Sequence, residues 1–296
     1  MPMVLGSDQI ENIKNLVEQN NSHTRIISVT SGKGGVGKTN FALNLAITLA
    51  NLKDSNQYPL NKRVVIMDAD LGLANINVLL GLIPKSNLYH VLKGQKTLKE
   101  IITPTAFGID LIAGASGLSQ LANLEESDRI NFIKAILELN YADFIIIDTA
   151  AGVSSNVTQF AGIAHETIIV TTPEPTSITD AYGIIKSIAL EPSPPLLKLV
   201  INRAQNQKEA EKVASKIIAI AQQFLNIKIE PLGFIPDSPL IPSAVRKQIP
   251  FTILNPGTPI SHSIEQIARR LLNIDLNTLE QTPGWKKILS YLTGHE

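Results

Sequence analysis

The stretch from Ser31 to Thr39, SGKGGVGKT, constrains this chain more than any other. Residues 32–39 fit the pattern G-x-x-x-x-G-K-[ST] at every fixed position, and glycines in such a loop let successive backbone N–H groups turn toward a phosphate. We expect Lys38 to reach the terminal phosphates and the Thr39 hydroxyl to ligate Mg²⁺. The loop therefore predicts a phosphate-binding site.

The residues on either side of this loop support that interpretation. Residues 25–30 (RIISVT) form a short β-branched run that suits a buried strand, and residues 41–50 are apolar almost all round, as in a helix packed under a sheet. Strand, glycine loop and helix in that order place an anion at the helix N-terminus. The alternative, a chance glycine-rich turn, does not explain this context.

Composition excludes several classes of function. The 296 residues are 44% hydrophobic, which is enough for a large core. Lys plus Arg and Asp plus Glu are both 26, so no overall charge attracts the chain to nucleic acid. There is no cysteine, which excludes disulfides, iron–sulfur clusters and thiolate zinc sites. The five histidines show no metal-binding spacing.

The lack of a recognisable membrane span or secretory signal predicts a cytoplasmic protein. No apolar run approaches the roughly 18 to 20 residues of a spanning helix. The first 20 residues are too polar and acidic for a secretory signal.

From residue 25 onward, strand and helix patterns alternate. This alternation predicts an α/β fold with a mostly parallel twisted sheet and helices on both faces. Further strands are expected at residues 63–67, 110–114, 143–148, 166–172, 197–201 and 230–235, and helices at about 125–140, 176–190 and 208–224.

Acidic residues follow two of these strands. Asp68 and Asp70 come after the strand at 63–67, where open α/β sheets bind ligands, although capping of the next turn is an alternative role. Asp148 closes the apolar run 143–148 in the Walker B arrangement, so we expect it to hold Mg²⁺ through water. Gly152 then lies in a turn that can sense the γ-phosphate.

The two ends of the chain are set apart from the predicted ATPase domain at 23–275. Residues 1–22 contain either a short amphipathic helix or a disordered leader. Residues 276–296 contain an apolar face at i, i+3, i+4 and i+7, formed by Trp285, Ile288, Leu289 and Leu292. This face suits either a helix in a membrane interface or a terminal helix docked on its own core.

The motif residues resemble the MinD/ParA ATPases. Residues 33–39 (KGGVGKT) look like the deviant Walker A motif, which has a second lysine early in the loop, and residues 68–75 (DADLGLAN) resemble the switch I segment of the MinD-like branch. Residues 171–182 (TTPEPTSITDAY) are most similar to the flagellar-number regulators of the FlhG, FleN and YlxH type.

The resemblance implies a role for each site residue. Lys33 would reach the phosphates of a partner subunit, so that ATP joins a homodimer. Asp70 would orient the attacking water, Asp68 would lie near the water shell of Mg²⁺, and Gly72 would belong to a switch. The other nucleotide contacts implied are Gly32, Gly34, Gly35, Val36, Gly37 and Asn40 around the phosphates and Asn202, Arg203, Pro236 and Asp237 around adenine.

The resemblance also implies partners. They are an FlhF-type GTPase, flagellar basal-body components and the inner face of the cytoplasmic membrane, with no specific nucleic acid. The GTPase contact is implied for Asp8 and Gln9, although residues 8–14 (DQIENIK) depart from the family's Asp-Gln-Ala-x-x-Leu-Arg element, and a lysine in place of the arginine loses a bidentate contact. Alternatives are a cell-division MinD, a partition ParA and a nucleotide-binding scaffold without turnover.

Overall fold

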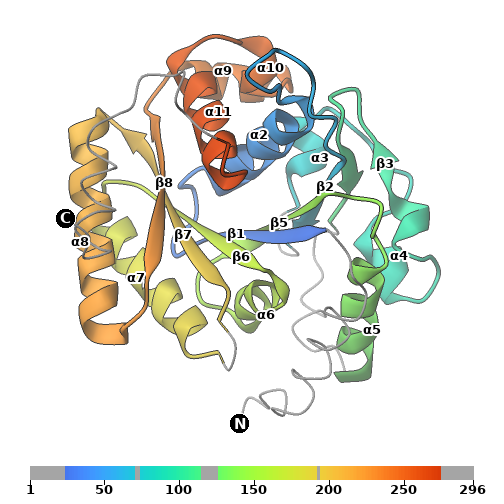
Figure 1. Cartoon of the computed structure of the whole chain (residues 1–296). Coiled ribbons are helices and arrows are strands. Elements are labelled where there is room, and N and C mark those ends of the chain that lie inside the picture. Colours follow the sequence, from blue (N-terminus) through green and yellow to red (C-terminus); the bar gives the residue numbers. More distant parts are fainter. Residues whose placement is uncertain (1–23, 71–73, 115–125, 192–193, 275–296) are drawn as a thin grey trace.

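The fold is built on one sheet. The computed structural model describes residues 24–70, 74–114, 126–191 and 194–274. The strands are β1 (Arg25–Ser31), β2 (Val64–Ala69), β3 (Thr103–Pro104), β4 (Asp110–Ile112), β5 (Phe144–Ala151), β6 (Glu166–Thr171), β7 (Leu196–Ala204) and β8 (Ile229–Pro236). Within the described ranges they form an eight-stranded sheet in the order β3-β4-β2-β5-β1-β6-β7-β8. All neighbours are parallel except β3 and β4, which confirms the expected fold class (Figure 1).

Helices cover both faces of this sheet (Figure 1). They are α2 (Lys38–Asn51), α3 (Ile76–Leu79), α4 (Leu88–Leu92), the 3₁₀ helix η1 (Lys99–Ile101), α5 (Glu126–Leu137), α6 (Ser155–Ile163), α7 (Pro175–Ala189), α8 (Gln207–Leu225), α9 (Leu240–Lys247), α10 (Phe251–Leu254) and α11 (Pro259–Leu271). None of the helices in the described ranges is both long enough and apolar enough to cross a membrane.

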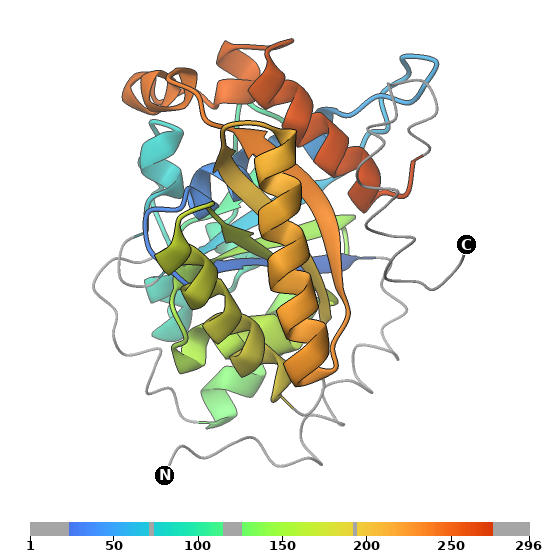
Figure 2. The same ribbon diagram turned by 90° about the vertical axis from the view of Figure 1, so that its left-hand side faces the viewer.

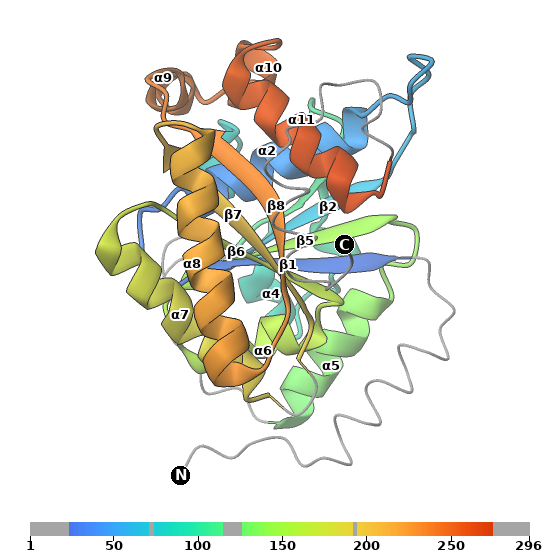
Figure 3. The ribbon, with the colours of Figure 1, turned by 60° about the vertical axis from the view of Figure 1, so that its left-hand side comes forward.

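Side-chain alternation along the central strands divides the core between the two faces. In β5, Phe144 and Ile146 join the cluster under α2, α10 and α11, whereas Ile145 and Ile147 join the cluster under α5 and α6. A third cluster lies under α7 and α8, which run side by side over the β6–β8 end of the sheet (Figures 2 and 3). Because both faces are buried, the strands read as continuous apolar runs.

The structure also contains elements that the sequence patterns do not predict. The edge strand β3 has two residues and α3, α4 and α10 have four or five, so no periodicity can show in them. The helices α6, α9 and α11 are also additional. The predicted helix near residues 10–17 and the predicted helix at 285–292 lie outside the described residues.

Charged side chains link the strands at the edge of the sheet opposite the glycine loop. Arg25 on β1 pairs with Glu166 on β6, and Lys198 on β7 pairs with both Glu166 and Glu230 on β8, at 3.4 and 2.5 Å. Arg25 also donates a hydrogen bond to the Leu271 carbonyl oxygen at the end of α11. The opposite charges offset one another, and they join α11 to the sheet.

A buried asparagine joins α2 to α10. Asn44 is 0% exposed, and its Oδ1 accepts hydrogen bonds from the backbone N–H (3.0 Å) and the hydroxyl (2.9 Å) of Thr252. Its Nδ2 donates to the Asn40 carbonyl oxygen one turn earlier in α2. All the polar atoms of this buried side chain are therefore used.

The start of the glycine loop lies against the backbone of α7. A Cβ atom at Gly32 would stand 2.0 Å from the Asp180 carbonyl oxygen and 2.7 Å from the Ala181 nitrogen. Only a residue without a side chain permits this approach. At Gly34, in the same loop, a Cβ would meet nothing within 4 Å.

We therefore expect Gly32→Ala to lower the free energy of unfolding of the nucleotide-free protein by about 1–3 kcal/mol, because α7 must move away from the loop. The measurement is urea denaturation followed by circular dichroism. The matched control is Gly34→Ala, which has room and no positive φ and should change stability by less than about 0.5 kcal/mol. Equal stabilities of the two variants would contradict the close approach.

Candidate functional site

The glycine loop connects β1 to α2 at the carboxyl edge of the sheet. Gly35 and Gly37 have φ angles of 76° and 89°, which glycine adopts without strain. The loop begins with a hydrogen bond from the Ser31 hydroxyl to the Lys33 carbonyl oxygen. A Cβ at Gly35, as at Gly34, would meet nothing within 4 Å, so the concave side of the loop is open to a ligand.

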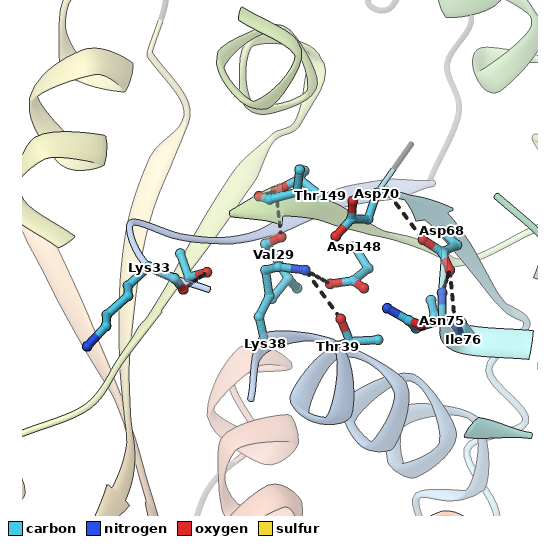
Figure 4. A network of polar contacts seen from close by, with 12 residues as sticks. Val29, Lys33, Lys38, Thr39, Asp68, Asp70, Asn75, Ile76, Asp148 and Thr149 are labelled. Atoms are coloured by element: carbon cyan, nitrogen blue, oxygen red, sulfur yellow. Dashed lines mark hydrogen bonds and ion pairs between the residues drawn. The ribbon is translucent and has the colours of Figure 1, made fainter. Parts of the chain in front are cut away.

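A buried ion pair lies beneath the loop. Lys38 Nζ is 2.7 Å from Asp148 Oδ1, and the two side chains are 7% and 0% exposed (Figure 4). Lys38 Nζ also lies 3.3 Å from the Thr39 hydroxyl. Burial raises the pKa of Asp148, whereas the charge of Lys38 opposes that rise. The two residues that sequence analysis assigns to phosphate and metal thus contact each other.

Asp148 retains capacity for a further contact. Its Oδ2 is buried and has no hydrogen-bond partner. A buried carboxylate oxygen without a partner is costly, so it marks a position where a water or an ion belongs. Asp148 pairs in register with Val29 on β1 and Asp68 on β2, which places it at the centre of the sheet's carboxyl edge.

Asp68 has a structural function in this conformation. Its Oδ2 accepts the backbone N–H groups of Asn75 (2.8 Å) and Ile76 (2.9 Å), and its Oδ1 accepts that of Asp70 (3.2 Å) (Figure 4). Burial, followed by the charge of Asp148, raises the pKa of Asp68 to about 7. The alternative of turn capping is therefore realised at Asp68, where it fixes the start of α3.

Asp70 follows β2 and is half-buried. Its charge contributes to the raised pKa of Asp148, so the two carboxylates are electrostatically coupled. Across the site, Gly152 has a φ of 93° and donates its N–H to the Ser31 carbonyl oxygen at 2.8 Å. The turn after β5 is therefore bonded to the residue that opens the glycine loop.

These observations fit a nucleotide with Mg²⁺. The open glycine loop, Lys38 and the unpartnered Asp148 oxygen offer donors to phosphate and an acceptor to metal-bound water. In the described part of the chain no three His, Asp or Glu side chains cluster as a metal site. We expect Thr39, and Asp148 through water, to hold Mg²⁺ together with phosphate oxygens.

A cavity of about 390 Å³ opens beside the loop. Five of the predicted nucleotide contacts line it, namely Gly37, Asn40, Asn202, Arg203 and Asp237, whereas Pro236 does not. The cavity also has an apolar wall that no sequence pattern predicts, and this wall includes Phe41, Ile235, Ile241, Pro242 and Phe251. Ile241, Pro242 and Phe251 belong to α9 and α10, which follow β8. No local sequence pattern shows that these helices line a cavity beside the glycine loop.

Asn202 contacts the loop itself. Its Nδ2 donates to the Val36 carbonyl oxygen at 2.7 Å, and its Oδ1 accepts the Arg203 N–H. A Cβ at Gly37 would stand 2.4 Å from that same Nδ2. Asn202 therefore supports the phosphate loop from the side of the cavity, a contact that differs from the adenine contact implied by resemblance.

Lys33 points away from the ion pair. Figure 4 shows its side chain directed to the opposite side of the loop from Lys38 and Asp148. Its Nζ lies 2.9 Å from Glu174 Oε2 and 3.0 Å from the Thr176 hydroxyl. No sequence pattern predicts these two contacts, although Glu174 lies in the Pro-Glu-Pro turn that follows β6. Lys33 remains 39% exposed.

Several predicted site residues lie outside the described ranges. They are Gly72 of the switch, Asp8 and Gln9 of the partner-binding segment, and Trp285, Ile288, Leu289 and Leu292 of the membrane-targeting segment.

Several known proteins are similar to this chain in sequence. A family model described as ParA, NUBPL iron-transfer P-loop NTPase, matches residues 22–272. The antiactivator FleN of Pseudomonas aeruginosa is 34% identical over 83% of this chain and 86% of its own length. The flagellum site-determining protein YlxH of Helicobacter pylori is 33% identical over 96% of this chain and 97% of its own.

Solved structures share the fold. The septum site-determining protein MinD of Pyrococcus horikoshii, complexed with Mg-ADP, superposes with a TM-score of 0.69 at 25% identity and covers 88% of this chain and 99% of its own. A chain of the MinC:MinD cell division protein complex from Aquifex aeolicus gives the same TM-score and identity, and the match covers 87% of this chain and 99% of that chain.

Proposed function

Because this chain belongs to the ParA family of P-loop NTPases, we propose that it is an ATPase that dimerises on ATP and regulates the number or placement of flagella. Lys33 carries the dimer proposal, since its exposed amine faces away from its own phosphate site. The flagellar role is supported by FleN and YlxH, of which YlxH aligns over nearly the full length of both chains.

Phosphoryl transfer to water needs charge neutralisation on the phosphates and an aligned nucleophile. Lys38 and the loop N–H groups would neutralise negative charge on the phosphates. Thr39 and Asp148 would hold Mg²⁺, which when bound neutralises further negative charge on the phosphates. Lys38 Nζ contacts Asp148 Oδ1, so a bound phosphate would compete with this carboxylate for the amine.

The alignment of the attacking water is assigned to Asp70. Thr149 follows Asp148 and donates its hydroxyl to the Val29 carbonyl oxygen, so no glutamate occupies the position where a base commonly follows Walker B. Asp68 accepts three backbone N–H groups. Because a carboxylate has about four acceptor positions, it can still accept a water of the metal shell. Asp70 lies beyond it, at the end of β2, and would orient the attacking water.

Turnover is proposed to be slow and dependent on the dimer, because each active site needs Lys33 of the other copy. The dimer would also strengthen membrane attachment, since two weak amphipathic segments act together. The protein would then alternate between the cytoplasm and the inner face of the cytoplasmic membrane. Basal-body components and an FlhF-type GTPase are its proposed partners.

A division MinD or a partition ParA is the alternative function. Putative MinD proteins of Emiliania huxleyi and Chlorella vulgaris are each 31% identical to this chain, whereas the two flagellar regulators are 33–34% identical. A partition protein binds DNA through a basic surface, and this chain has equal numbers of acidic and basic residues. The identities favour the flagellar role.

Lys33→Ala is expected to preserve ATP binding within about threefold and to weaken the ATP-dependent dimer by about tenfold or more, because a charge-assisted contact across the interface is lost. Light scattering with ATP and Mg²⁺ measures the dimer. Lys216→Ala, an exposed lysine on α8, serves as the control. An unchanged dimer in Lys33→Ala would exclude the trans role.

Removal of residues 283–296 is expected to reduce ATP-dependent sedimentation with liposomes several-fold, since the apolar face of Trp285 to Leu292 is lost. Vesicles of phosphatidylethanolamine with phosphatidylglycerol are suitable. Lys286→Gln, off the apolar face, should retain most binding. If the shortened chain sediments like the intact one, the segment is not the membrane anchor.

The partner proposal predicts that the cognate FlhF-type GTPase is retained by the intact chain and lost from a chain lacking residues 1–20. A pulldown compares the two, with the Asp8→Ala/Gln9→Ala variant as the narrower change. Equal recovery of the GTPase would place its binding surface elsewhere.

A further inference from the structure

Gln248 ends α9 in a backbone conformation that a glutamine adopts only under strain. Its φ angle is 54°, in the left-handed region, at the position after a helix where glycine is the common residue. Its backbone N–H donates to the Val245 carbonyl oxygen at 3.0 Å, which closes the helix. Because glycine would adopt this conformation without strain, the glutamine side chain is the feature to explain.

The side chain of Gln248 reaches α3. Its Nε2 donates a hydrogen bond of 2.8 Å to the carbonyl oxygen of Val78, 170 residues earlier in the chain. Gly81 lies beside the same amide, since a Cβ atom there would stand 3.4 Å from Gln248 Oε1. Val78 is the third of the four residues of α3, and the last carbonyl oxygens of a helix lack the partners of its regular pattern. The bond therefore holds the carboxyl end of α3.

The other end of α3 is held by the candidate site. Asp68 Oδ2 accepts the backbone N–H groups of Asn75 and Ile76 (Figure 4). Asp68 Oδ1 accepts the N–H of Asp70 at 3.2 Å. A helix of four residues has too few internal hydrogen bonds to hold its own position. α3 is therefore held by Asp68 at one end and by Gln248 at the other.

The support on the side of Gln248 is the wall of the cavity. Gln248 lies between α9, which lines the cavity with Ile241 and Pro242, and α10. α10 is joined to α2 by the hydrogen bonds between Thr252 and the buried Asn44. Gln248 therefore connects α3 to a wall that is itself fixed to the helix of the phosphate loop.

We propose that Gln248 is a positioning residue for ATP hydrolysis. Its hydrogen bond to Val78, which we name the α3 anchor, fixes the helix to which Asp68 is bonded. Asp68 in turn holds the backbone of Asp70, which would orient the attacking water. The inference rests on the proposed ATPase function and on that role of Asp70. Loss of the anchor is expected to slow hydrolysis and to leave ATP binding unchanged.

Gln248→Gly removes the α3 anchor together with the strain of the left-handed residue. We expect kcat to fall about two- to tenfold, as for one lost hydrogen bond, with an unchanged KM for ATP. The melting temperature should stay within about 2 °C, whereas a merely structural role would lower stability and activity together. Gln248→Asn also tolerates the left-handed conformation, but its amide is one methylene short of Val78 and should lower kcat likewise.

Phosphate release is measured at protein concentrations where turnover per chain no longer rises, so that dimer affinity does not enter. Hydrogen–deuterium exchange of the nucleotide-free protein gives a direct second readout, because the α3 amides should exchange faster in Gln248→Gly. Asn226→Gly is the matched control. Asn226 is also an exposed amide in a left-handed conformation (φ 52°) at the end of a helix, α8, and its loss should change neither kcat nor exchange at α3.

The outcomes separate the anchor from the function on which it rests. A lower kcat with faster exchange at α3 and preserved stability supports the anchor. An unchanged kcat, unchanged exchange at α3, a raised KM or a stability that falls with kcat overturns the anchor while the ATPase function stands. If Asp70→Asn hydrolyses ATP as fast as the unaltered chain, the role of Asp70 is wrong and the anchor with it. If the unaltered chain releases no phosphate, the proposed ATPase function fails.

Discussion

The buried ion pair of Lys38 and Asp148 holds the glycine loop, α2 and the central strand β5 in one arrangement before any nucleotide binds. Two charges that are almost fully removed from water require each other, because either one alone would be costly. The pair is therefore weak as a source of net stability but strong as a constraint on geometry. It keeps the lysine beneath the loop and leaves one Asp148 oxygen without a partner, so the site is pre-formed where phosphate and metal are needed.

Much of this site follows from local patterns in the sequence. The glycine loop, the strand before it and the apolar run ending in Asp148 each predict their own structure, and the parallel sheet brings their ends to one edge. Asp68 marks the limit of such reasoning. Its position after a buried strand was predictable, but its engagement with three backbone N–H groups depends on the path of the turn toward α3. A pattern of residue types does not specify that path.

Contacts between distant segments were not predictable. The apolar wall of the cavity comes partly from α9 and α10, which are short or weakly marked elements, and Lys33 meets acceptors from β6–α7. Such neighbours are decided by the packing of whole helices on a sheet. The same packing places the row of charges from Arg25 to Glu230 at the opposite edge, so the ions that join strands and the ions that serve the nucleotide are separated.

The Asn44–Thr252 hydrogen bonds have a consequence for signalling. Asn44 lies on the helix that begins at the phosphate loop, and Thr252 follows Phe251, which lines the cavity. Since one buried amide joins them, the phosphate side and the opposite wall of the cavity form a single rigid body. Under the proposed function, a change that reports the γ-phosphate is therefore expected at the ends of β2 and β5, where Asp70 and Gly152 lie, and not at this wall.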